Sequence, residues 1–151
     1  MSIREILASK SIGEIFSISP DSSISAAIAI MGQHDIGSLV VKESGQMVGL
    51  LTDRDIVRGL HKARGDLTKT LVREVMVASP VVGHPEDTAD QVRRLMTESH
   101  ISHLPVVGEE GLVGIISFYD VARTALSNVE FENKLLKRYI KDWPEEDTNK
   151  D

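Results

Sequence analysis

The 151-residue chain contains no cysteine, few aromatic residues and no long apolar run. The lack of cysteine excludes disulfides, thiolate nucleophiles and cysteine-ligated zinc or iron–sulfur clusters. No apolar run approaches the roughly 20 residues that span a bilayer, and residues 1–5 lack the apolar stretch of a signal peptide. These absences fit a protein of the reducing cytoplasm without a membrane segment.

Basic residues are in the minority, because 17 Lys and Arg stand against 23 Asp and Glu. An acidic chain without a basic stripe is a poor candidate for binding nucleic acid. The sequence has no Gly-x-Ser-x-Gly, Walker or Gly-x-Gly-x-x-Gly motif, so we expect no enzyme activity. His100 and His103 are three residues apart, but no cysteine or carboxylate cluster completes a metal site, and we expect none.

The chain does contain an internal repeat. Residues 36–41 (Ile-Gly-Ser-Leu-Val-Val) resemble residues 101–106 (Ile-Ser-His-Leu-Pro-Val), an offset of 65 positions. The same offset pairs Gly49 with Gly114, and the register holds over roughly forty positions without a gap. Two homologous units therefore make up most of the chain.

Each repeat predicts the element order β-α-β-β-α. Ser23 and Thr88 follow short extended pieces (16–18 and 81–82) and are candidate N-caps of amphipathic helices. Hairpins follow at 38–51 and 104–116, and closing helices at 53–62 and 118–128. The residues expected to be buried share one helical face: Ile24, Ala27, Ile28 and Met31 in the first unit, and Ala89, Val92, Leu95 and Met96 in the second.

A unit of this size cannot bury both of its faces alone, so we expect the two units to pack against each other in an α/β (α+β) fold. The predicted parts are an N-terminal helix (1–11), the first unit (12–63), a polar linker (64–71), the second unit (72–128) and a C-terminal helix with an acidic tail (129–151).

Both hairpins lead into the same phrase, which is glycine, two apolar residues, Thr or Ser, two variable residues and Asp. It occupies residues 49–55 (Gly-Leu-Leu-Thr-Asp-Arg-Asp) and 114–120 (Gly-Ile-Ile-Ser-Phe-Tyr-Asp). One interpretation is a capping box, in which the hydroxyl and the carboxylate satisfy backbone N–H groups at a helix start. The other is a nucleotide site, in which the helix N-terminus and the hydroxyl hold a phosphate and the carboxylate accepts ribose hydroxyls. The spacing alone does not decide between them.

Together with the repeated strand at 36–41 and 101–107, these phrases resemble a tandem pair of CBS (cystathionine β-synthase) domains, a Bateman module, over about residues 12–126. The opening helix and the Phe-Glu-Asn…Arg-Tyr-Ile ending resemble small stand-alone bacterial members. The resemblance implies a pseudo-twofold disc with clefts between the two units. Family members bind adenine-containing ligands there, so it implies AMP first, or ADP, ATP, NAD(H) or S-adenosylmethionine.

Carried over by position, the resemblance assigns three kinds of ligand contact. Ribose hydroxyls would bind Asp55 and Asp120, whereas phosphate would bind Thr52, Arg54, Ser117 and His103. The adenine would lie against a larger set, namely Ile18, Ile36, Gly37, Ser38, Met76, Pro80, Val81, Ile101 and Ser102. Because the second phrase has Phe118-Tyr119 where the first has Asp53-Arg54, it lacks that cation, and we expect the two clefts to differ.

We therefore expect a non-catalytic regulatory module that senses adenine nucleotides and acts on an effector protein that the sequence does not identify. The alternative is a ligand-independent scaffold that acts through protein contacts, and a third hypothesis is nucleic-acid binding. Phe131, Leu135 and Tyr139 have helical spacing in the predicted C-terminal helix and fit either a core or a dimer contact. With the family resemblance, they favour a homodimer.

Overall fold

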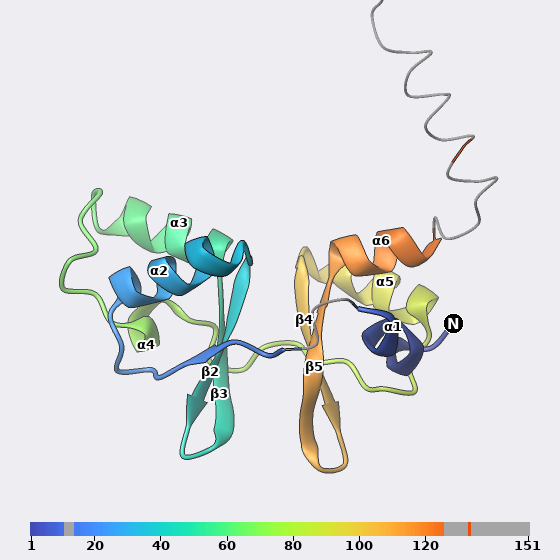
Figure 1. Ribbon diagram of the computed structural model, residues 1–151. Coiled ribbons are helices and arrows are strands. Elements are labelled where there is room, and N and C mark those ends of the chain that lie inside the picture. The colour runs from blue at the N-terminus through green and yellow to red at the C-terminus, as the bar shows by residue number, and fades with distance from the viewer. Residues whose placement is uncertain (11–13, 126–132, 134–151) are drawn as a thin grey trace, which may run out of the picture.

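The computed structural model describes residues 1–10, 14–125 and 133. Two units of similar build lie side by side, and each has a long β-hairpin whose turn points away from α2, α3, α5 and α6 (Figure 1). Within the described residues, no helix is both long and apolar enough to cross a bilayer. The predicted C-terminal helix and acidic tail, and the last residues of the helix predicted at 118–128, lie outside the described residues.

The first unit contains a three-stranded sheet with two helices. Strand β1 runs parallel to β2, and β2 pairs antiparallel with β3, with Val40 opposite Leu50. Ser23 caps the first helix as predicted, because its hydroxyl accepts a hydrogen bond from the Ala26 N–H at 3.1 Å. The elements are β1 (Ser17–Ile18), α2 (Ile24–His34), β2 (Ser38–Glu43), β3 (Gln46–Thr52) and α3 (Asp53–Lys62).

The second unit repeats this arrangement around its own core. Strands β4 and β5 form an antiparallel hairpin with Val106 opposite Gly114, and Thr88 caps the first helix through the Gln91 N–H at 3.1 Å. The elements are α5 (Ala89–Ser99), β4 (His103–Gly108), β5 (Gly111–Ser117) and α6 (Phe118–Ala125). The predicted α/β fold of two repeated units is confirmed.

The extended piece predicted at 81–82 does not form a strand. In the first unit the Val40 N–H donates to the Phe16 carbonyl at 3.0 Å. The residue equivalent to Val40 is Pro105, which has no N–H to donate. Of residues 81–83, only Gly83 pairs with β4, through an isolated parallel bridge to Val106. A single imino acid therefore accounts for the difference between the two sheets.

The short helix α1 (Ile3–Ser9) precedes the first unit in the sequence but packs into the core of the second. The short helix α4 (Val72–Val75) precedes the second unit but packs into the core of the first. Ile3 and Ile6 of α1 are fully buried in the core of the second unit. Val72 of α4 is fully buried in the core of the first unit. The two units are therefore tied together by an exchange of helices.

Equivalent backbone contacts hold these two helices. The Ile3 N–H donates to the Asp87 carbonyl, and the Val72 N–H donates to the Ser22 carbonyl, both at 2.9 Å. Ion pairs recur as well, between Arg4 and Glu86 and between Arg73 and Asp21. The helices carry the related sequences Ile-Arg-Glu-Ile and Val-Arg-Glu-Val, at an offset of 69 rather than 65. This second repeat was missed in the sequence because its offset differs.

Most of the predicted core is confirmed, but Ile28 is an exception. Ile24, Ala27 and Met31 are buried against the first sheet, as are Val92 and Met96 in the second unit. Ala89 and Leu95 are partly buried. Ile28, one residue beyond Ala27, is 48% exposed, because α2 packs on the sheet along a narrower stripe than the sequence pattern indicates.

Candidate functional site

The first phrase forms a capping box at the start of α3. The Asp55 N–H donates to the Thr52 hydroxyl oxygen at 3.2 Å. In return, the Thr52 N–H and hydroxyl both donate to Oδ2 of Asp55, at 3.0 and 2.9 Å. These contacts fix Asp55 at the junction between β3 and α3.

The second phrase forms the same box at the start of α6. The Ser117 N–H donates to Oδ2 of Asp120 at 2.9 Å, and the Asp120 N–H donates to the Ser117 hydroxyl oxygen at 3.1 Å. Both Asp55 and Asp120 are only 7% exposed. The capping interpretation is thus confirmed in both units. It does not exclude ligand binding, because a carboxylate has two oxygens and several acceptor positions.

A cavity of about 520 Å³ is lined by residues of both units. That volume lies within the usual range for small-molecule sites. Six of the predicted site residues line it, namely Ile36, Gly37, Ser38, His103, Ser117 and Asp120. The structure therefore brings residues 36–38 of the first unit, which were predicted to contact adenine, next to the Ser-x-x-Asp phrase of the second.

The other predicted site residues lie outside this lining. Ile18 is buried in the core of the first unit, and Arg54 donates from Nη1 to the His100 carbonyl at 3.1 Å, joining the two units. Their ligand contacts stay predictions, as do those of the remaining set: Thr52, Asp55, Met76, Pro80, Val81, Ile101 and Ser102.

Gly37 and His103 lie against each other across the boundary between the units. A Cβ at Gly37 would come within 3.0 Å of Cε1 and 3.1 Å of Nε2 of His103. The Gly37 carbonyl also accepts a hydrogen bond from the Asp53 N–H at 3.0 Å. Any larger residue at position 37 would require the imidazole of His103 to shift by a few tenths of an ångström.

Burial favours the uncharged form of His103. Burial lowers its pKa from the ordinary 6.5, and the nearby Lys10 lowers it further, while Asp53 and Asp120 act in the opposite direction without reversing the shift. The Ser102 hydroxyl lies 3.1 Å from its Nδ1. The uncharged imidazole that burial favours can offer the cavity a hydrogen bond.

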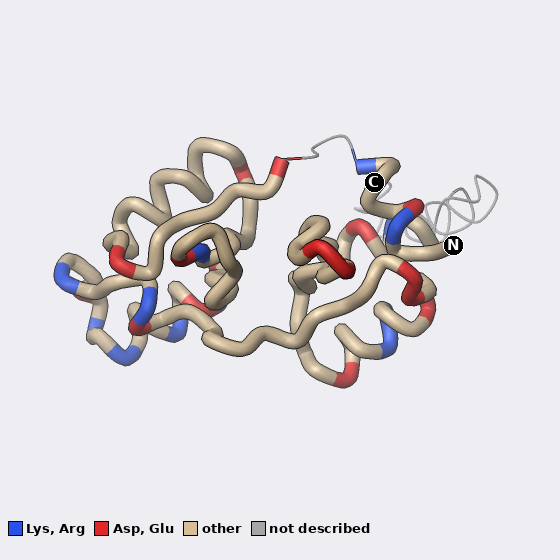
Figure 2. Tube along the Cα trace, turned by 90° about the horizontal axis from the view of Figure 1, so that it is seen from below, with Lys and Arg blue, Asp and Glu red and all other residues tan. Residues whose placement is uncertain are grey.

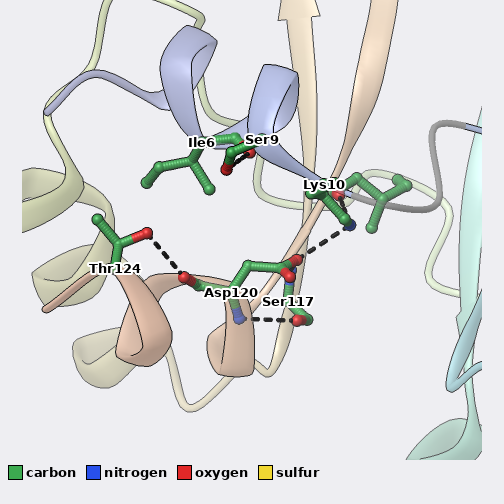
Figure 3. Close-up of polar contacts among 7 residues, drawn as sticks. Ile6, Ser9, Lys10, Ser117, Asp120 and Thr124 are labelled. Carbon is green, nitrogen blue, oxygen red and sulfur yellow. Dashed lines mark hydrogen bonds and ion pairs between the residues drawn. The ribbon is translucent and has the colours of Figure 1, made fainter. Parts of the chain in front are cut away.

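Lys10, which sequence reasoning missed, supplies a cation beside Asp120 (Figure 3). Its Nζ lies 3.0 Å from Oδ2 of Asp120 and donates to the Ile115 carbonyl at 2.8 Å. Burial raises the pKa of Asp120, but hydrogen bonds from Ser117 and Lys10 and the charge of Lys10 outweigh it, so the pKa lies below its ordinary value. The second phrase itself has no cation, as its sequence indicated, but Lys10 from outside the phrase supplies one at this cavity.

Other lining residues that the sequence did not indicate add charge and aromatic surface. Arg123 lies 6.0 Å from the ring centre of Tyr119, which is 70% exposed at the rim. Phe16 stacks on His34 with ring centres 4.2 Å apart. Glu14 and Asp35 also line the cavity, so it presents both signs of charge. Both signs also occur along the described parts of both units (Figure 2).

No group of three His, Cys, Asp or Glu in the described parts of the chain is arranged to hold a metal ion. In the sequence, the Ser-x-x-Asp phrase at residues 117–120 was the local pattern that indicated this cavity. Lys10 had no such signal, because 110 residues separate it from Asp120 and only the docking of α1 brings them together.

Comparison with known proteins gives one family. The sequence model of the CBS domain matches residues 3–62 and 72–127. The CBS domain-containing protein YhcV of Bacillus subtilis is 36% identical over 115 residues, which cover 76% of this chain and 81% of YhcV. A solved protein with CBS domains from Burkholderia ambifaria superposes with a TM-score of 0.81 at 27% identity, covering 85% of this chain and 96% of that one.

A further solved structure carries ligands. The CBS domain pair of protein MJ0100, solved in complex with 5′-methylthioadenosine and S-adenosyl-L-methionine, superposes with a TM-score of 0.71 at 28% identity. The match covers 82% of this chain and 94% of that pair. With two matched domains, shared fold and shared size, the chain belongs to the CBS-domain family as a pair of CBS domains in a small protein.

Proposed function

We propose that this CBS pair is a non-catalytic regulatory module that binds an adenine nucleotide, AMP foremost, in the cavity between its two units. The observation that carries the proposal is that one cavity joins the Ser117–Asp120 phrase of the second unit to residues 36–38 of the first. A buried, ionised carboxylate at this point suits a ribose, because hydrogen bonds to charged acceptors are the stronger kind.

The related pair of MJ0100 supports an adenosine-containing ligand, since both of its bound molecules contain adenosine. A phosphate would find the Ser117 hydroxyl and the start of α6 on one side, with Lys10 and Arg123 on the lining. The adenine would lie beside Ile36 and Gly37. ADP, ATP, NAD(H) and S-adenosylmethionine are the other candidate ligands.

Regulation follows from the position of the cavity. A ligand that contacts both units stabilises the arrangements in which they are correctly spaced, and so shifts the population towards them. We propose that the response passes to a separate effector protein. We also propose a homodimer, supported by exposed apolar side chains on α2, α3 and α6, namely Ile28, Val57 and Phe118.

The test is thermal unfolding of nucleotide-free protein with AMP, ADP, ATP, NADH and S-adenosylmethionine, and with GMP as the base control. A ligand at 100 times its Kd stabilises by about 2.7 kcal/mol, which raises Tm by roughly 5–11 °C for a chain of this size. We expect a shift with at least one adenine ligand and none with GMP. A flat panel would contradict the proposal and favour a ligand-independent scaffold.

A further inference from the structure

Lys10 occupies the part of the cavity that the proposed ribose would need. Its Nζ contacts Oδ2 of Asp120 and the Ile115 carbonyl, as Figure 3 shows. The side chain is 22% exposed, so most of it is removed from solvent. A ligand that binds Asp120 through its hydroxyls therefore competes with an ammonium group that is already there.

The backbone of Lys10 is held in place by the second unit. Lys10 caps the C-terminus of α1, with its N–H donating to the Leu7 carbonyl at 3.3 Å. Ile3 and Ile6 anchor this helix in the core, and Leu7 lies so close to Gly114 that a Cβ there would come within 2.8 Å of it. The ammonium group can therefore turn on its own side chain while the docking of α1 keeps the backbone of Lys10 at the cavity wall.

Asp55 has no comparable cation among the described residues. Its Oδ2 accepts from Thr52, and Nη1 of Arg58, the cation paired with it, lies 4.0 Å from Oδ1 on a side chain that is 65% exposed. The two capping boxes share their backbone hydrogen bonds, in which each hydroxyl and each carboxylate accepts from an N–H of the other residue. The ammonium group at Asp120 is thus a property of this one cavity and not of the repeated phrase.

An ammonium group deprived of its carboxylate in a partly buried cavity is costly unless another anion replaces it. A neutral nucleoside would donate hydrogen bonds from its ribose hydroxyls to Asp120, but it carries no anion for Lys10. A nucleoside 5′-phosphate engages the carboxylate with its ribose and offers the displaced ammonium group a phosphate. We infer that Lys10 is the specificity-determining residue by which this cavity prefers a nucleoside 5′-phosphate to the neutral nucleoside. The inference rests on the proposed function.

The test compares AMP with adenosine by calorimetric titration of wild type, Lys10→Met and Lys10→Arg. Methionine keeps the apolar stem without the charge, and Lys69→Met, at an exposed position outside the cavity lining, is the matched control. We expect wild type, Lys10→Arg and Lys69→Met to bind AMP at least tenfold more tightly than adenosine. In Lys10→Met the two affinities should agree within threefold, because AMP binds more weakly and adenosine at least as tightly as before.

Two outcomes would overturn the inference in distinguishable ways. If wild type binds both ligands and Lys10→Met keeps the wild-type ratio, Lys10 does not set the preference, and the proposed function stands. If nucleotide-free wild type binds neither ligand, the proposed function is wrong and this inference is wrong with it. The Lys10→Arg variant keeps the positive charge and must therefore keep the preference for AMP over adenosine. If it does, substitution at position 10 does not by itself disrupt the fold.

Discussion

Replacing Asp120 by asparagine is expected to abolish the preference of the protein for AMP over 2′-deoxyadenosine 5′-monophosphate. In the proposed complex the ribose hydroxyl donates to the carboxylate of Asp120, and hydrogen bonds to charged groups contribute about 1.5–3 kcal/mol, or roughly 10- to 100-fold in affinity. Asparagine keeps an oxygen that can accept the Ser117 N–H but removes the charge. The two nucleotides should then bind Asp120→Asn within threefold of each other, as measured by calorimetry.

Asp55→Asn is the matched control for this prediction. Asp55 occupies the same capping box with the same exposure, so both variants disturb a helix start in the same way. Asp55 does not line the cavity, and the ribose preference at the Asp120 site should persist in this variant. Loss of the preference in Asp55→Asn together with its retention in Asp120→Asn would place the ligand in the opposite cleft.

Ile3→Ala is expected to destabilise the protein by about 2–5 kcal/mol, which is the usual cost of truncating a buried isoleucine to alanine. Ile3 is fully buried among Val92, Met96 and other residues of the second core, so the substitution leaves a void that the surrounding strands and helices cannot fill. For a chain of this length the Tm should fall by roughly 4–20 °C. Thermal and denaturant unfolding measure the change.

Ile28→Ala tests whether this loss comes from the docking of α1. Ile28 has the same side chain but is about half exposed on α2, so its truncation should cost less than about 1 kcal/mol. Similar costs for the two variants would mean that α1 does not complete the second core. Lys10 would then have no fixed place beside Asp120.

Local patterns predicted much of the fold. The helix at 53–62 was predicted with its observed bounds, because a Thr-x-x-Asp phrase satisfies free N–H groups at the helix start and so marks its first residue. The hairpins were predicted within one or two residues of their observed strands, because apolar, β-branched runs on either side of a glycine-bearing turn are local signals as well.

The rest depended on contacts between distant segments. The exchange of α1 and α4 depends on the burial of Ile3 in the core of the second unit and of Val72 in the core of the first. The pattern of residues within each helix does not specify which unit it packs against. The same holds for the pairing of Lys10 with Asp120. Pro105 is a different case, because the sequence alone shows that it has no N–H. The structure was needed to show that the equivalent N–H, that of Val40, bonds the first strand to the second.

A crystal structure of the protein with AMP tests the central claim most directly. We expect the nucleotide in the cavity, with ribose hydroxyls within hydrogen-bond distance of Asp120, adenine beside Ile36 and Gly37, and Nζ of Lys10 turned from Asp120 towards the phosphate. AMP bound elsewhere on the protein would contradict the account, as would an empty cavity at saturating AMP with the Lys10–Asp120 pair still closed.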